Sequence, residues 1–543
     1  MHRRLVMTSA IAALVAAAFL PGSGLGSSAA EVRGARAEIP VGLAEAIHAR
    51  LGAGPIRLAS QAVADPSFGA RVALSADGTT ALVSAIGVGN DKGAVYVYHV
   101  ADAGSWTSSS TPAATLTNTA GPAHDLFGRG LAISADGTTA FIGAPFHGGG
   151  TGAVFVFHVS DEGAWASTST PTATLTVNSG LFTGIAVVAS PDGTTIVAGA
   201  PFANGFAGAA YVFHVASEDA WVSSSSPTAT LSNANESNSD LEVGGVVAIS
   251  SDGTTALLSD TNGANGAGAA YVFHVASEAG WASSSTPSAI LSNDSDLPGS
   301  LLGESLALSG DGTTAFLGAA GVNGQRGAVD VFHSAGEDAW ASTTNPTAIL
   351  TNAGGAKNDF LGAFVRASAD GSTVVATATG AAKATGDVQI FHVSDETAWT
   401  SSSAPTARLT DSVRVPKDFL GDGLAVAADG ATVLAGAPGV NWSTGVADVF
   451  HVSDASSWVT SSTPTARLTN SALPAPRCVV PRVVGLPLAV AKFSLADSNC
   501  RLGKVTRVHV KSKKVKKGRV VSQSPAANKH LAPGSRVKVK VKK

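Results

Sequence analysis

Residues Leu131–Phe146 read LAISADGTTAFIGAPF, and this stretch decides the fold. A short apolar run leads to Asp136-Gly137, and a second apolar run ends at Gly-Ala-Pro. An Asp-Gly pair between two apolar runs supplies the positive φ angles of a tight hairpin turn. The stretch therefore predicts a β-hairpin, and versions of it occur seven times in the chain.

The seven copies keep fixed internal offsets. Aligned on the turn aspartate they are 59 residues apart, with one spacing of 56 and one of 60. A His follows each aspartate after 22 residues, and a Trp follows each His after seven more. Only a repeated structural unit gives this regularity. The repeated residues are Asp77, Asp136, Asp192, Asp252, Asp311, Asp370, Asp429, His99, His158, His214, His274, His333, His392, His451, Trp106, Trp165, Trp221, Trp281, Trp340, Trp399 and Trp458.

Each copy carries four strand signals. In the copy from Gly130 to Thr176 they are GLAIS, TTAFIGA, GAVFVFHV and PTATLT, bounded by Gly, Pro, Asp or Ser. A solenoid needs polar end caps, which the sequence lacks, whereas a ring buries both faces of every sheet. We therefore predict an all-β fold, a seven-bladed β-propeller of four-stranded blades over residues 54–470. PIRLAS at residues 55–60 resembles a fourth strand that would close the ring, and PTARLT at Pro464 competes for that place.

Two glycine motifs carry a family resemblance. Phe127-Gly128 and Gly143-Ala144-Pro145 resemble the two halves of the FG-GAP repeat found in the seven-bladed head of integrin α chains. The first glycine recurs in all seven copies, while Phe precedes it in the first two. FG-GAP repeats that bind calcium place several spaced carboxylates before the Gly. Here Ser134 stands two residues before Asp136, and one carboxylate per loop disfavours a Ca²⁺ site.

The repeated His and Trp residues are interpreted as structural. A catalytic residue is needed once, whereas a packing or hydrogen-bonding residue is needed in every blade, so metal or general-base chemistry of the His is the weaker reading. Each Trp lies in a Ser/Thr-rich connection and is expected to seal the joint between blades, with sugar stacking as the alternative. No catalytic residue, cofactor or metal site is assigned, and the chain is not predicted to be an enzyme.

The connections divide between two faces of the ring. Antiparallel geometry places the first-to-second and third-to-fourth connections on one face and the remaining connections on the other. The first face is nearly the same in every copy. The second differs, with loops such as PFHGGGT, PFANGFA and GVNGQR. Because specificity usually lies on variable loops of a rigid scaffold, we predict an unknown protein or glycan ligand on this varied face.

The N-terminus predicts export. Arg3 and Arg4 precede an apolar run that ends at Pro21, followed by small residues, which is typical of a secretory signal peptide over residues 1–30. Residues 31–53 are expected to be a linker with a short amphipathic helix. No transmembrane anchor is expected in the mature chain, because the apolar run is short and no later stretch is apolar enough.

Residues 478–543 follow a short linker, 471–477, and differ in composition. They hold 17 Lys and Arg against one acid, Asp497, whereas the preceding part holds 18 basic and 38 acidic residues. Cys478 and Cys500 are the two cysteines of the chain, and a disulfide is the economical expectation for an exported protein. The basic charge favours anionic polymers. Secretion and the absence of interleaved aromatic residues argue against nucleic acid.

The same segment resembles a PASTA domain, a small α+β module of bacterial penicillin-binding proteins and membrane kinases. The matching elements are Val480-Pro481-x-Val483-x-Gly485, Gly518-x-Val520-x-x-Gln523-x-Pro525 and Pro533-Gly534-x-x-Val537. The resemblance implies a secreted bacterial protein that contacts a cell-wall polymer, peptidoglycan or an anionic glycopolymer. We predict a cell-wall-associated recognition protein. The alternatives are a propeller hydrolase or lyase acting on an extracellular polymer, and a passive surface spacer.

Overall fold

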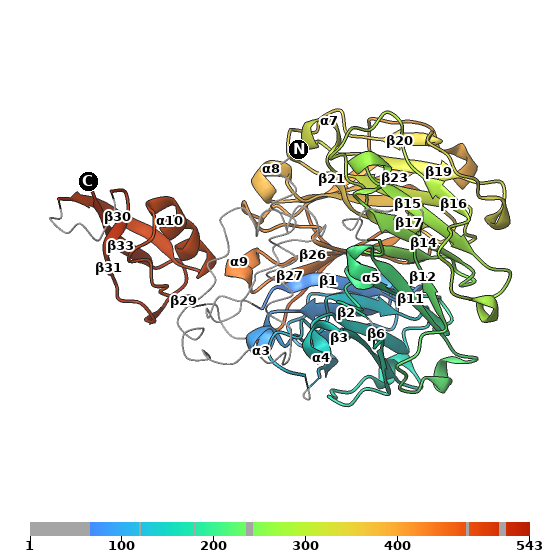
Figure 1. Cartoon of the computed structure of the whole chain (residues 1–543), viewed down its shortest axis with the longest axis horizontal. Coiled ribbons are helices and arrows are strands. Elements are labelled where there is room, and N and C mark those ends of the chain that lie inside the picture. The colour runs from blue at the N-terminus through green and yellow to red at the C-terminus, as the bar shows by residue number, and fades with distance from the viewer. Residues whose placement is uncertain (1–65, 119–120, 179, 235–242, 474–476, 510–516) are drawn as a thin grey trace, which may run out of the picture.

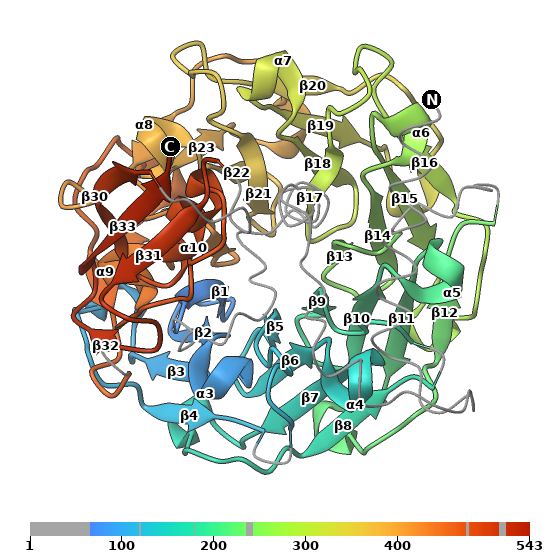
Figure 2. The ribbon, with the colours of Figure 1, turned by 60° about the vertical axis from the view of Figure 1, so that its left-hand side comes forward.

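The computed structural model describes residues 66–118, 121–178, 180–234, 243–473, 477–509 and 517–543. The predicted signal peptide, the helix expected within residues 31–53 and the PIRLAS segment lie outside the described residues. Seven four-stranded antiparallel sheets and a small C-terminal domain make up the structure (Figure 1). Figure 2 shows the seven sheets as blades around a common axis, which confirms the predicted propeller.

Each blade consists of four consecutive strands hydrogen-bonded in sequence order. The strands are, blade by blade, β1 (Phe68–Leu74), β2 (Thr80–Ala85), β3 (Val95–His99) and β4 (Ala114–Leu116); β5 (Gly130–Ile133), β6 (Thr139–Ala144), β7 (Ala153–His158) and β8 (Ala173–Thr176); β9 (Val187–Ala189), β10 (Thr195–Ala200), β11 (Ala209–His214) and β12 (Ala229–Leu231); β13 (Val247–Ile249), β14 (Thr255–Asp260), β15 (Ala269–His274) and β16 (Ala289–Leu291); β17 (Leu302–Leu308), β18 (Thr314–Ala319), β19 (Val329–His333) and β20 (Ala348–Leu350); β21 (Leu361–Ala367), β22 (Thr373–Ala378), β23 (Asp387–His392) and β24 (Ala407–Leu409); β25 (Gly423–Val426), β26 (Thr432–Ala437), β27 (Val446–His451) and β28 (Ala466–Leu468).

Short helical turns join the strands. One-turn helices between the second and third strands are α3 (Val88–Asp91), α4 (His147–Gly150), α5 (Ala203–Phe206), α6 (Gly263–Gly266), α7 (Val322–Gln325), α8 (Ala381–Ala384) and α9 (Val440–Ser443). The 3₁₀ turns between the third and fourth strands are η1 (Ala103–Ser105), η2 (Glu162–Ala164), η3 (Glu218–Ala220), η4 (Glu278–Gly280), η5 (Glu337–Ala339), η6 (Glu396–Ala398) and η7 (Ala455–Ser457).

The hairpin of the opening stretch is present but wider than a two-residue turn. β5 and β6 pair from Ile133 and Ala140 outward. Between them the Gly137 amide donates to the Ser134 carbonyl oxygen at 3.1 Å, and the Ser134 amide donates to the Thr139 carbonyl oxygen at 2.9 Å. Gly137 has a φ of 72°, and Asp136 is not among the residues with positive φ. The Asp136 backbone therefore stays in the ordinary region, and its carboxylate is used for side-chain contacts.

The hydrophobic core is divided into clusters that each span two consecutive blades. The cluster that closes the ring joins Phe68 and Val83 of the first blade to Leu434 and Val449 of the last. The innermost strands contact one another in turn around the axis, and β25 contacts β1. Because each sheet buries both faces against its neighbours, the blades stabilise one another and no end cap is needed.

The closing strand is now assigned. β28, from the PTARLT segment at Pro464, is the fourth strand of the last blade. The last blade thus completes its sheet with its own fourth strand, while the PIRLAS segment lies outside the described residues. The last and first blades join by packing and by isolated parallel bridges, Phe68 with Gly445 and Ser109 with Leu468.

Glycines allow the blades to approach closely. A Cβ atom on Gly143 would lie 1.9 Å from the carbonyl oxygen of Gly184 in the next blade, and a Cβ on Gly436 would lie 1.9 Å from that of Gly69. Within a blade, the Gly128 amide donates to the Gly143 carbonyl oxygen at 3.0 Å. Any side chain at these positions would force neighbouring backbones apart, so the glycines of both motifs set the spacing between blades.

The C-terminal domain packs a helix, α10 (Leu488–Asp497), on small sheets. β30 (Arg501–Val508), β33 (Arg536–Lys542) and β31 (Val520–Ser524) form one sheet, and β29 (Cys478–Val479) pairs with β32 (His530–Leu531). β30 and β33 are parallel. The core of this domain consists of its own residues, including the Cys478–Cys500 disulfide, and so the predicted disulfide is confirmed.

Candidate functional site

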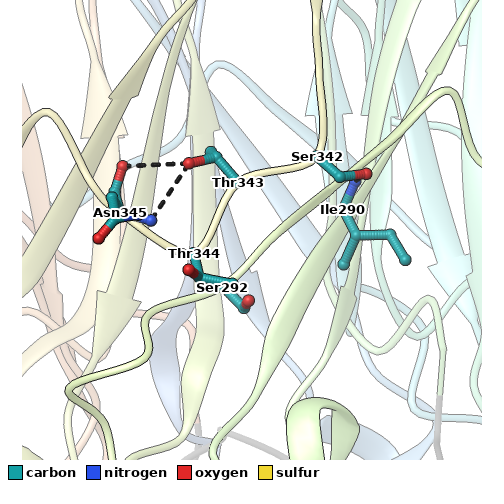
Figure 3. Close-up of a pocket in the computed structure, with 6 residues that line it drawn as sticks. All are labelled: Ile290, Ser292, Ser342, Thr343, Thr344 and Asn345. Carbon is teal, nitrogen blue, oxygen red and sulfur yellow. Dashed lines mark hydrogen bonds between the residues drawn. The ribbon is translucent and has the colours of Figure 1, made fainter.

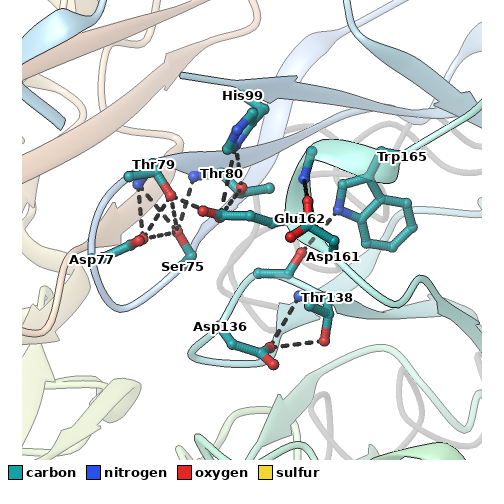
Figure 4. Close-up of polar contacts among 12 residues, drawn as sticks. Ser75, Asp77, Thr79, Thr80, His99, Asp136, Thr138, Asp161, Glu162 and Trp165 are labelled. Atoms are coloured by element: carbon teal, nitrogen blue, oxygen red, sulfur yellow. Dashed lines mark hydrogen bonds and ion pairs between the residues drawn. The ribbon is translucent and has the colours of Figure 1, made fainter. Parts of the chain in front are cut away.

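The repeated aspartate, Ser and Thr residues form a polar network at the hairpin turns of the first six blades, on the uniform face (Figure 4). In the first blade Asp77 accepts hydrogen bonds from the Ser75 hydroxyl at 2.6 Å and the Thr79 hydroxyl at 2.8 Å. Thr80 lies 3.0 Å from Nδ1 of His99, at the end of the third strand. The same Thr–His contact occurs in all seven blades. The repeated Asp and His therefore tie the turn to the third strand.

A carboxylate from the next blade completes the network. Glu162 of the second blade accepts hydrogen bonds from the hydroxyls of Thr79 at 2.8 Å and Thr80 at 2.7 Å in the first blade. Four further blade pairs use Glu218, Glu278, Glu337 and Glu396 in the same way. The acid comes from the following copy of the repeat, a relation that the ring alone establishes.

The repeated tryptophans lie at the joints between blades. Trp165 belongs to the cluster shared by the first and second blades, and its Nε1–H donates to the Gly137 carbonyl oxygen at 2.9 Å. In the next joint the Trp221 ring lies 5.5 Å from the Phe141 ring at a steep angle. Each Trp of the seven blades is at most 8% exposed. These rings are not available for stacking on a sugar.

The turn carboxyls are held as anions. Partial burial by itself raises the pKa of Asp136, but hydrogen bonds from Ser134 and Thr138 outweigh that effect and place the pKa below its ordinary value. The pKa is shifted in the same direction at Asp77, Asp252, Asp311 and Asp370. Within the described residues no group of three or more His, Cys, Asp and Glu side chains is placed to hold a metal ion.

A shallow hollow of about 350 Å³ lies at the outer edge between the fourth and fifth blades (Figure 3). Two of its polar side chains, Ser342 and Thr343, are engaged in backbone contacts. The Ser342 hydroxyl accepts from the Ile290 amide at 3.0 Å, and the Thr343 hydroxyl accepts from the Asn345 amide at 3.2 Å. Equivalent contacts occur between other blades, for example at Ser167 and at Thr168. The hollow is thus part of the repeated joint that covers the edge of each fourth strand.

The varied face is built as predicted from the other two sets of connections. The one-turn helices meet the segments that lead into each first strand: the Phe182 amide donates to the Gly150 carbonyl oxygen at 2.8 Å, and the His124 amide to that of Asn90 at 3.1 Å. One residue of these segments has a positive φ in the same place of six blades, and it is usually bulky: Ser67, Leu126, Phe182, Leu301, Phe360 and Phe419. Such backbone is strained for a non-glycine residue and is found often at functional sites.

Three half-buried aromatic rings form a row on this face, which we name the aromatic row: Phe146, Phe182 and Phe202. The Phe182 ring lies 4.8 Å from the Phe146 ring and 5.2 Å from the Phe202 ring, in edge-to-face contacts. Leu181 beside it is 40% exposed. The row therefore presents aromatic surface from the loops PFHGGGT and PFANGFA of the second and third blades and from the segment that leads into β9.

An acid and a histidine lie next to the aromatic row. His147 Nδ1 is 2.9 Å from Asp125 Oδ2, and Asp125 is buried with its Oδ1 atom unpartnered. Asp359 and Asp418 precede the first strand of their blades as Asp125 does, and each accepts a nearby backbone amide at 2.7 Å. The Asp125–His147 pair was missed, because its partners come from different connections of one blade.

The C-terminal domain presents a basic surface. Along β33 Val537, Val539 and Val541 are buried, while Lys538 and Lys540 alternate with them on the exposed side. Gln523 joins the two family motifs: its Oε1 accepts from the Val483 amide at 2.7 Å and its Nε2 donates to the Pro481 carbonyl oxygen at 2.8 Å. The spaced motif residues thus meet in one place. In the described residues no helix has the length and apolar character to span a bilayer.

The fold and these surfaces define the protein as a seven-bladed β-propeller joined to a small basic α+β domain. The family model of the PASTA domain matches residues 479–543, so the second domain is a PASTA domain, a type that typically binds peptidoglycan. No curated protein matches the chain. Among solved structures, Kuenenia stuttgartiensis hydrazine synthase is similar with a TM-score of 0.48 and 13% identity, over 74% of this chain and 99% of that chain.

Proposed function

We propose that the protein is a secreted, cell-wall-associated recognition protein, in which the PASTA domain holds the chain on the wall polymer and the propeller presents a ligand-binding face. The observation that carries the proposal is the PASTA domain itself, with 17 basic residues against one acid over residues 478–543. Such a surface attracts anionic polymers. The disulfide suits the oxidising space outside the cell.

We infer that the propeller recognises its ligand on the varied face and is not an enzyme. The aromatic row supports this part of the proposal, because edge-to-face rings at a surface offer large contact area at low conformational cost. Its FG-GAP resemblance favours the same face, since integrin-type propellers use it. The rival readings, a polymer hydrolase or a passive spacer, are outcomes of the tests below.

Co-sedimentation with purified bacterial cell wall tests the anchor. The full chain, residues 54–470 and residues 478–543 are each measured across a salt series; separate cores make the two parts suitable for separate expression. We expect the full chain and the PASTA domain to pellet even at high salt. Release at moderate salt would show attraction by charge alone. Pelleting of the propeller without the PASTA domain would reverse the assigned roles.

Matched charge variants refine the result. Lys538→Gln with Lys540→Gln removes two exposed charges of the PASTA domain, and Lys357→Gln with Lys417→Gln removes two exposed charges of the propeller. We expect the first pair to reduce wall binding and the second to leave it unchanged.

The aromatic row has its own test. Phe146→Ala in the propeller fragment should reduce any binding of that fragment to wall fragments. Release of soluble wall products by the wild type would favour the hydrolase instead.

A further inference from the structure

Three arginines gather at the axis of the propeller. Arg71 and Arg366 lie on β1 and β21, and Arg129 immediately precedes β5. These segments belong to the first strands of the blades, which surround the axis in Figure 2. The blade architecture does not require arginine there. At the place of Arg366 the other six blades have Ala73, Ala132, Val188, Ala248, Ala307 and Ala425.

The arginine side chains reach toward one another across neighbouring blades. The Arg71 guanidinium carbon lies 5.3 Å from the centre of the Phe364 ring in the sixth blade. Arg71 also contacts the seventh blade, because its Nη1 donates to the Asp422 carbonyl oxygen at 3.1 Å. Arg71 of the first blade therefore contacts the sixth and seventh blades, and its charge acts on Arg129 of the second blade.

Most of the guanidinium donors are not used inside the protein. A guanidinium carries five N–H donors. Arg366 donates from Nη1 to the Val365 carbonyl oxygen at 2.8 Å, and Arg71 donates from Nη1 to two carbonyl oxygens. Arg129 is 7% exposed, yet its guanidinium forms no hydrogen bond with another described residue. A partly or fully buried cation is stabilised by a group that accepts its free N–H donors.

Burial and neighbouring charges act on the pKa of all three arginines. Burial lowers the pKa of Arg129 well below its usual value; Arg71 lowers it further, and Asp422 opposes the change. Burial and the neighbouring Arg71 lower the pKa of Arg366 to about 10. Asp422 also opposes the lowering of the pKa of Arg71. The arginines therefore lie close enough for their charges to repel one another.

We propose that Arg71, Arg129 and Arg366 form a binding site at the propeller axis for a dianionic phosphate group, either free phosphate or a phosphate monoester. Guanidinium forks match phosphate oxygens with two parallel hydrogen bonds. A dianion brings negative charge between guanidinium groups that repel one another, and the donors of Arg129 supply contacts. The site belongs to the propeller and does not depend on binding of the PASTA domain to the wall.

Calorimetric titration of the mature full chain tests the site. Inorganic phosphate, glycerol 3-phosphate and sulfate are titrated at pH 7.5 and constant ionic strength. We expect one saturable site for phosphate, at least tenfold weaker in Arg129→Met and in Arg366→Ala. Arg326→Met, at an exposed position of the varied face, and the Lys538→Gln/Lys540→Gln pair are the controls and should bind as the wild type does. Tighter binding of glycerol 3-phosphate than of inorganic phosphate would identify a phosphate monoester as the ligand. Tighter binding of inorganic phosphate would identify the free ion.

Several results would overturn the proposal. These are the absence of a saturable phosphate site in the wild type, or a site lost in the lysine pair but kept in both arginine variants. Affinity should also fall several-fold at pH 5, because a phosphate monoester loses its second charge below a pKa of about 6 and inorganic phosphate loses it at a higher pH. Binding that is unchanged at pH 5 counts against a dianion. Circular dichroism confirms that each variant folds. If Arg129→Met does not fold, Arg366→Ala provides the test, because five other blades already have Ala at the position that corresponds to Arg366.

Discussion

Trp165 donates its indole N–H to the carbonyl oxygen of Gly137, 2.9 Å away, so that a ring from the third-to-fourth connection closes over the hairpin turn of the same blade. The bond recurs with the same sequence separation in every blade. Because Trp165 also packs in the cluster shared with the preceding blade, one side chain fixes both the turn and the joint.

Substitutions of Trp165 should separate these two roles. Trp165→Phe keeps most of the apolar contact but leaves the Gly137 oxygen without its donor, and should cost about 1 kcal/mol of unfolding free energy. Trp165→Ala also opens a cavity and should cost about 3 to 5 kcal/mol. Urea denaturation measures both. Val222→Ala, at a position that is 69% exposed, is the control with little expected effect. Equal costs for Phe and Ala would show that the hydrogen bond, not packing, dominates.

The seam between the sixth and seventh blades can be strengthened. In place of the Glu that bonds the preceding blade, the last blade has Ala455, although Ser372 and Thr373 of the sixth blade match the hydroxyls that Glu162 engages. Ala455→Glu should therefore stabilise the protein by about 1 kcal/mol, and Glu162→Ala should destabilise it by a similar amount. Thermal melting measures both. A destabilised Ala455→Glu variant would mean that the seam has no room for the longer side chain.

Glu304 predicts a pH dependence of stability. Burial raises the pKa of its carboxyl from 4.5 to about 8, and its Oε2 atom has no hydrogen-bond partner. The folded state thus holds a proton that the unfolded chain releases above pH 4.5, so this contribution to stability is fully present at lower pH and is lost as the pH rises through about 8. Glu304→Gln stays neutral and should melt at a higher temperature than the wild type at pH 9, with little difference at pH 5.

The control for this pH effect is Asp338→Asn, which removes the same charge at an exposed position. It should shift melting little at either pH. If Glu304→Gln gains no stability at pH 9, the Glu304 carboxyl is solvated in the folded protein and the expected pKa is wrong.

Two buried aspartates should differ in their importance. Asp448 is fully buried and pairs with Arg414, which is 1% exposed, and with Arg467 at 3.0 Å. Asp387 pairs with Arg408, which is 46% exposed. Asp448→Ala leaves the buried Arg414 and its neighbour Arg467 with Asp411 as their shared acid, and should cost about 3 kcal/mol or more. Arg408 can turn to water, so that Asp387→Ala should cost about 1 kcal/mol. Chemical denaturation compares them, and equal costs would contradict the argument from burial.

Much of the fold could be predicted because the determinants are local or repeated. Asp-Gly turns, alternating apolar runs and a period close to 59 residues define the strands and their number. The glycines of the two motifs lie where neighbouring blades approach closely. The PASTA motifs were recognisable for the same reason. The alternation of Val with Lys along β33 is a property of consecutive residues, and burial follows it directly.

The contacts of the candidate sites could not be predicted in the same way. The bond from Thr79 to Glu162 joins residues 83 apart, and the Asp125–His147 pair links different connections. Arg71 and Phe364 come from opposite ends of the propeller sequence. In the sequence each of these residues looked like an ordinary turn, loop or strand residue. Periodicity indicates which residues share a role, but it does not indicate which copies of the repeat become neighbours.

The sequence by itself determined the number of blades, the strand order within each blade, the basic PASTA domain and its disulfide. Hydrophobic periodicity, turn chemistry and charge composition act over short distances along the chain, and so they can be read from it. Only the tertiary structure decided that the last blade completes its sheet with its own fourth strand, which carboxylate reaches which blade, and that three arginines meet at the axis. Those contacts arise from closing the ring, which brings together residues hundreds of positions apart.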